Sequence, residues 1–145
     1  MKFSAKALLI TALISPLSFS QKNKQYVSLD AWDMGIERVN DSLFRWILFH
    51  PDSEFPCLRI ETMEPATRTL IEQKNICSII DNETSKVFGF KNLTYIDIHD
   101  IRLVESMFMF EVELTPLEST KVVLISCGLE LSSSRLEDLI CKVDH

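Results

Sequence analysis

The pattern of apolar and polar positions is clearest in residues 95–114, where it predicts a β-hairpin. In the second half of this segment, apolar residues at even positions alternate with methionine and glutamate, which is the period-two pattern of a strand with one buried face. In the first half the apolar residues move from even positions, Ile96 and Ile98, to odd ones, Ile101 and Leu103. A shift of one residue would send half of these side chains to the other face of the sheet.

A β-bulge at His99-Asp100 would restore a single apolar face, because two residues there would lie opposite one residue of the partner strand. A turn at Glu105-Ser106 then pairs Leu103 with Phe108. In this register the core face of the hairpin holds Ile96, Ile98, Ile101, Leu103, Phe108, Phe110, Val112 and Leu114.

The same register gathers polar side chains on the opposite face of the hairpin. Asp97 lies across from Glu113, and the His99-Asp100 bulge lies across from Glu111, with Arg102 nearby. Like charges placed directly opposite each other destabilise a sheet, so this cluster of acids around one imidazole is a candidate site.

Helical periodicity predicts one helix at each end of the folded region. In residues 30–50, which Ser28 or Asp30 would cap, apolar residues recur at spacings of three and four, and His50-Pro51 ends the helix. They are Trp32, Ile36, Val39, Leu43 and Ile47. In residues 134–143, Ser134 and Glu137 form a capping box. The apolar stripe that follows consists of Leu136, Leu139, Ile140 and Val143.

Between these helices the pattern mainly predicts strands. Residues 57–62 and 121–127 read as strands, and residues 76–80 and 86–90 as a hairpin. Residues 65–74 read as a short helix because Pro65 suits a helix start, with a strand as the alternative that Thr67, Thr69 and Ile71 favour. Helices segregated from strands indicate an α+β domain. We expect an antiparallel sheet of about five to six strands with an N-terminal and a C-terminal helix packed on one face.

Residues 1–20 have the pattern of a secretory signal peptide. Lys2 and Lys6 precede an apolar run over residues 7–14, and Ser18-Phe19-Ser20 is a small-x-small cleavage site. We therefore expect residues 21–145 to form a single secreted or periplasmic domain. No other stretch approaches the roughly 20 apolar residues of a membrane helix, so we expect no membrane insertion.

Charge narrows the choice of partner. The chain carries a formal net charge of −6, and removing Lys2 and Lys6 with the leader would bring it to −8. An acidic surface does not attract nucleic acid or anionic membrane. The charge would suit a basic protein partner or a cation, and it serves solubility equally well. Of these partners we expect another protein.

An even number of cysteines behind a signal peptide indicates disulfides. The four cysteines allow three connectivities, and loop length alone favours Cys57–Cys77 with Cys127–Cys141. Three Asn-x-Ser/Thr sequons, at Asn40, Asn82 and Asn92, are candidate glycosylation sites. They favour a eukaryotic secretory pathway, while coincidence in a bacterial periplasmic protein remains the alternative.

The acidic cluster, defined here as Asp97, His99, Asp100, Glu111 and Glu113, is the only constellation that suggests chemistry. It would suit a divalent cation or a general base, but acids on an outer sheet face are more often solvated surface or a partner-binding surface. The chain has no recognised catalytic or phosphate-binding motif, and we expect no cofactor. We expect an exported, disulfide-stabilised protein-binding or inhibitory module without catalysis. The alternative is a small secreted hydrolase or metal-dependent enzyme that uses His99, Asp100 and Glu111.

Overall fold

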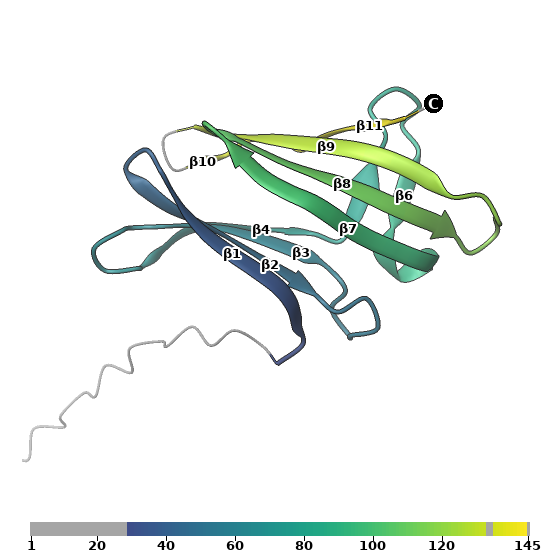
Figure 1. Cartoon of the computed structure of the whole chain (residues 1–145), viewed down its shortest axis with the longest axis horizontal. Coiled ribbons are helices and arrows are strands. Elements are labelled where there is room, and N and C mark those ends of the chain that lie inside the picture. The colour runs from purple at the N-terminus through teal and green to yellow at the C-terminus, as the bar shows by residue number, and fades with distance from the viewer. Residues whose placement is uncertain (1–28, 133–134, 145) are drawn as a thin grey trace, which may run out of the picture.

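The computed structural model describes residues 29–132 and 135–144, which form two antiparallel sheets and a small ribbon (Figure 1). The first sheet has the order β1-β2-β3-β4, the second has the order β10-β9-β8-β7 with β11 also paired to β9, and β5 pairs with β6. The strands are β1 Ala31–Val39, β2 Ser42–Phe49, β3 Leu58–Met63, β4 Leu70–Ile76, β5 Ser78–Ile80, β6 Val87–Gly89, β7 Leu93–Val104, β8 Met107–Pro116, β9 Val123–Ser132, β10 Arg135–Leu136 and β11 Ile140–Val143.

The predicted α+β class is wrong, because nearly all the regular secondary structure in this part of the chain is strand. Its one helical element is the single 3-10 turn η1, Phe90–Asn92. Accordingly, no helix within the described ranges is long and apolar enough to cross a membrane. The predicted signal peptide, residues 1–20, lies outside the described residues.

The predicted N-terminal helix is replaced by the β1–β2 hairpin. Val39 pairs with Ser42, so Asn40-Asp41 forms a two-residue turn. Asn40 has a φ of 53°, in the left-handed region that asparagine tolerates better than most residues. Apolar residues recur here at the spacings of a helix because β2 buries side chains on both of its faces. Phe44 enters the core, while Ile47 is buried on the other side.

The predicted C-terminal helix is also wrong. Residues 135–143 form the short strands β10 and β11 instead, and Ser134, the predicted cap, lies outside the described residues. Cys141 in β11 lies directly opposite Cys127 in β9, and the two are joined by a disulfide. Pairing with β9 and this covalent link outweigh a local helical preference, which is weak in comparison with tertiary contacts.

The short helix predicted for residues 65–74 is a turn followed by β4. The Glu64 carboxylate accepts hydrogen bonds from the backbone N–H groups of Ala66 and Thr67, which fixes the turn. These bonds lower the pKa of Glu64, with the Thr67 hydroxyl making the largest contribution. After the turn, Leu70 to Ile76 pair with β3.

The predicted strands elsewhere are confirmed. Leu58 and Ile60 of β3 are fully buried, as the alternation in residues 57–62 predicts. The hairpin after residue 76 is β5–β6, and β9 is central, with β8 on one side and β10 and β11 on the other.

The core lies between the two sheets. The Phe44 ring of the first sheet packs against the Phe108 ring of the second, with centroids 4.8 Å apart. The largest fully buried apolar side chains of this core are Phe44, Leu58, Ile60, Ile79, Phe108, Phe110, Val112, Leu114, Ile125 and Leu129. The fold is therefore a two-layer β-structure in which each sheet buries one face against the other.

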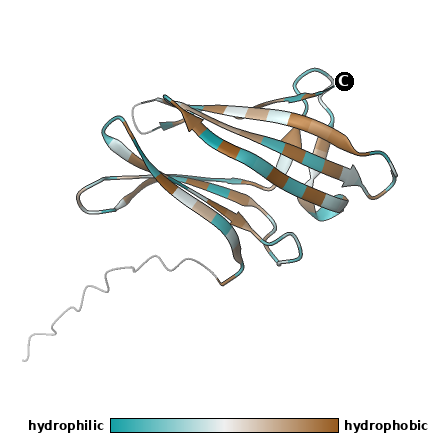
Figure 2. Ribbon diagram, viewed as in Figure 1, coloured by the Kyte–Doolittle hydropathy of each residue, from teal (hydrophilic) through white to brown (hydrophobic). Residues whose placement is uncertain are grey.

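The register predicted for the β7–β8 hairpin is confirmed. Leu103 pairs with Phe108, Ile98 with Val112, and Ile96 with Leu114. All eight predicted core-face residues belong to the core or pack against it. The colours along β7 in Figure 2 alternate between apolar and polar residues accordingly.

Candidate functional site

The acidic cluster lies on the outer face of β7 and β8, where a bulge shapes the strand. The register shifts between His99 and Arg102, where the sequence predicts the bulge, and Asp100 has a φ of 50°. This left-handed conformation lets Asp100 occupy the extra position, and Ile101 returns to the core side. Asp97 pairs with Glu113, and His99 pairs with Glu111, as predicted.

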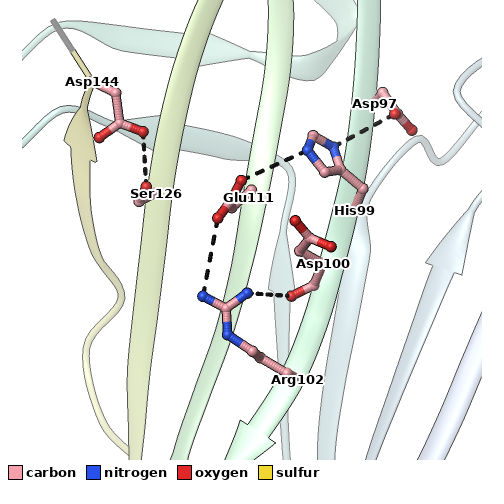
Figure 3. A network of polar contacts seen from close by, with 7 residues as sticks. All are labelled: Asp97, His99, Asp100, Arg102, Glu111, Ser126 and Asp144. Carbon is pink, nitrogen blue, oxygen red and sulfur yellow. Dashed lines mark hydrogen bonds and ion pairs between the residues drawn. The ribbon is translucent and has the colours of Figure 1, made fainter.

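His99 and Arg102 connect the carboxylates of Asp97 and Glu111 in a network (Figure 3). His99 Nδ1 lies 3.5 Å from Asp97 Oδ2, and His99 Nε2 lies 3.8 Å from Glu111 Oε2. Arg102 donates a hydrogen bond to the Asp100 carbonyl oxygen at 3.3 Å and lies 4.0 Å from Glu111 Oε1. The network is half-exposed and has acceptors in excess.

Three members of the acidic cluster offer a metal-ligand arrangement. One ligand atom each from His99, Asp100 and Glu111 lies within 4.8 Å of the others. The mixed nitrogen and oxygen donors would suit a transition metal better than calcium. The Arg102 guanidinium, however, already supplies a positive charge beside Glu111 and would repel a cation there.

An apolar surface borders the acidic cluster on the same sheet face. We call it the methionine patch: Val104, Met107, Met109, Gly128 and Ile140, from β7, β8, β9 and β11. Val104 pairs with Met107, and Gly128 pairs with both Met109 and Ile140, so the patch is continuous across the four strands. Val104 is 52% exposed, Met107 38% and Ile140 65%, which means that no described segment covers them.

The sequence signals only part of this patch. Met107 and Met109 stand out beside the acids, where exposed methionines would suit a protein-binding face, and cover by the expected helices was the alternative. Gly128 and Ile140 join the patch only through pairing of β9 with β8 and β11. No local pattern reveals that pairing.

Both disulfides have the connectivity that loop length favours. Cys57–Cys77 links the start of β3 to the end of β4, and Cys127–Cys141 links β9 to β11. Each disulfide cross-links two neighbouring strands of its own sheet.

The three sequon asparagines, Asn40, Asn82 and Asn92, are all exposed. The side-chain oxygen Oδ1 of Asn82 accepts a hydrogen bond from the Cys141 backbone N–H at 2.8 Å, which leaves the side-chain nitrogen Nδ2, the atom that carries an N-linked glycan, uninvolved in that bond. In the same sequon the Thr84 hydroxyl donates to Asp81, and this bond lowers the pKa of the Asp81 carboxyl.

Asp97 differs from the rest of the acidic cluster because it also lines a cavity. This cavity has a volume of about 340 Å³ and lies between β1, β7 and the loop that follows β2. The other four members of the cluster are not part of its wall. Strand alternation alone does not show that Asp97 contributes to this cavity.

No protein-family model, curated protein or solved structure matches the chain.

Proposed function

We propose that this protein is an exported, disulfide-stabilised module that binds another protein and performs no catalysis. Its binding surface is the outer face of the second sheet, where the acidic cluster borders the methionine patch. One observation carries this proposal: Met107 and Ile140 are exposed on the same sheet face as the carboxylates of Glu111 and Glu113.

The chemistry of this face suits protein recognition. Exposed apolar side chains that gather in one place, with polar residues around them, are typical of interaction sites. Methionine adapts its shape to a partner, because its side chain is unbranched and its sulfur is polarisable. The excess of carboxylates would steer a basic partner toward the patch and accelerate association.

Catalysis by His99, Asp100 and Glu111 is the weaker alternative. Their ligand atoms come together, but Arg102 competes with a metal ion for Glu111. The three residues lie outside the wall of the cavity, whereas catalytic groups usually converge in a concave site.

Export is part of the proposal and rests on two features. Residues 1–20 have the composition of a signal peptide. Two disulfides join strands of the folded region, and such bonds persist in oxidising compartments. Glycosylation at the sequons would distinguish the eukaryotic secretory pathway from the bacterial periplasm.

Site-specific photo-crosslinking tests the proposal. A photoreactive phenylalanine analogue replaces Met107 in one protein and Gln73 in another, since Gln73 is an exposed residue of β4 in the first sheet. Both proteins are irradiated in the secreted or periplasmic fluid of the natural source. We expect a discrete protein adduct at position 107 that excess unlabelled protein abolishes. Absence of that adduct, or an equal one at position 73, would contradict the proposal.

A further inference from the structure

The cavity beside Asp97 has features of a small-molecule site that the proposed function does not use. Its volume of about 340 Å³ falls within the range of ligand pockets, roughly 300–1,000 Å³. It opens at one side of the molecule, where β1 and β7 are the edge strands of their sheets. The two layers thus supply opposite walls of one site.

The inner wall of this cavity is apolar. Leu48 of β2 and Ile98 of β7 are buried core residues, and Ile96 packs against the same core. Pro51 and Pro56, from the loop between β2 and β3, complete this part of the wall. A ligand would therefore need an apolar body to fill the inner part of the cavity.

Aromatic residues stand at the mouth of the cavity. Trp32 is 66% exposed and meets the His50 ring edge to face, with centroids 4.9 Å apart. The His50 ring is also held by the Asp52 N–H, which donates to His50 Nδ1 at 3.1 Å. Tyr95 lines the opposite side from β7 and is 47% exposed.

The cavity wall carries two carboxylates and the His50 imidazole, and the Arg59 guanidinium lies outside the wall, 5.0 Å from the ring centroid of the wall residue Phe49. Asp52 and Asp97 belong to its wall, and no lysine or arginine does. Partial burial raises the pKa of the Tyr95 hydroxyl, and the negative charges of Glu113 and Asp97 raise it further. An anion would be repelled from such a site, and a neutral molecule would gain nothing from it.

We infer that this cavity binds a small organic amine, whose apolar body contacts Leu48, Ile96 and Ile98 and whose ammonium group lies between Trp32, Tyr95 and the Asp97 carboxylate. Aromatic faces attract cations through the ring quadrupole, and a carboxylate adds a charge-assisted contact. The ammonium group remains at the mouth, where water still reaches it, so desolvation costs little. This inference does not depend on the methionine patch or on a protein partner.

Calorimetric titration with three probes of one shape tests the inference. The probes are 2-phenylethylamine, 2-phenylethanol and 3-phenylpropanoate, which share an aromatic body and differ in charge. We expect the amine to bind about tenfold more tightly than the alcohol, as a charge-assisted contact implies, and the carboxylate not to bind. Equal affinity for amine and alcohol, binding of the carboxylate, or no binding of the amine would each overturn the inference.

Substitution of the two carboxylates in the wall tests whether the amine binds in this cavity. Asp52→Asn combined with Asp97→Asn removes both carboxylates, and both residues are exposed, so the fold should persist. We expect this variant to lose about tenfold in affinity for the amine and to bind the alcohol unchanged. The control, Glu105→Gln combined with Glu130→Gln, removes two exposed charges near the β7–β8 turn, where Leu131 N–H donates to the Ser106 carbonyl oxygen. An equal loss in the control would contradict the assignment to this cavity.

Discussion

At the scale of single residues, the Trp46 ring determines which residue fits opposite it at position 35. Gly35 in β1 pairs with Trp46 in β2. A Cβ atom at position 35 would lie 1.9 Å from the nearest carbon of the Trp46 ring, and the stiff indole cannot move aside cheaply. Gly128, by contrast, would place a Cβ atom 3.6 Å from Met107 Sδ, an ordinary contact distance.

We therefore expect Gly35→Ala to destabilise the protein and Gly128→Ala to be tolerated. Overpacking against Trp46 should lower the free energy of unfolding by about 1–3 kcal/mol. The change at position 128 should stay within about 0.5 kcal/mol. Denaturant unfolding of the two variants measures both effects. Equal stabilities would show that Trp46 does not contact Gly35 in this way.

The positions of several residues of the acidic cluster could be predicted, because few strand registers fit the alternation of apolar and polar residues. A change of phase between Ile98 and Ile101 requires one extra residue, and only His99-Asp100 is available. The pairs Asp97–Glu113 and His99–Glu111 follow from that choice. The 4.0 Å approach of Arg102 to Glu111 does not follow, because it depends on side-chain rotamers.

At the scale of elements, the predicted helices failed because helical spacing is ambiguous in a hairpin. Trp32, Ile36 and Val39 have helical spacing, yet Trp32 and Ile36 lie exposed on β1 while Val39 is buried. The decisive signal was the turn at Asn40-Asp41, which lacks the glycine that usually marks such turns. In residues 135–143, the apolar residues that would form one stripe of a helix lie instead in and between the two short strands β10 and β11.

The disulfide Cys127–Cys141 should determine whether β11 stays paired. β11 has only four residues, and Cys141 is its one buried side chain. Replacing both cysteines with alanine should cost about 3 kcal/mol in the free energy of unfolding, as closure of a loop of this length implies. We expect the amides of residues 140–143 to lose protection from hydrogen exchange more than those of β8.

The matched control is the double replacement of Cys57 and Cys77 with alanine. It opens a loop of similar length but should leave the relative protection of β11 intact, because that disulfide links β3 to β4. Selective exposure of β11 in the control, or none in the first variant, would contradict this role.

At the scale of the whole molecule, the missing helices change the meaning of the surface. The core lies between the two sheets, and no helix covers the outer face of the second sheet in the described part of the chain. Sequence patterns locate the buried faces well, because burial follows alternation. Which face remains uncovered depends on how many layers form, and that is decided by long-range pairing.

Exposed apolar side chains also occur on β1, which makes the choice of surface testable. Trp32, Met34 and Ile36 lie at the edge of the first sheet, and Met34 is 47% exposed. Met107, in the methionine patch, is 38% exposed. The two methionines therefore report on competing surfaces at similar exposure, while Met63, at 3%, reports on the interior.

Methyl NMR of ¹³C-labelled methionine tests the central proposal most directly. The protein is titrated with the partner identified by crosslinking, and all four methyl signals of Met34, Met63, Met107 and Met109 are followed. We predict that the signals of Met107 and Met109 shift or broaden in proportion to complex formed, while those of Met34 and Met63 stay in place. A response at Met34 with none at Met107 and Met109 would contradict binding through the outer face of the second sheet.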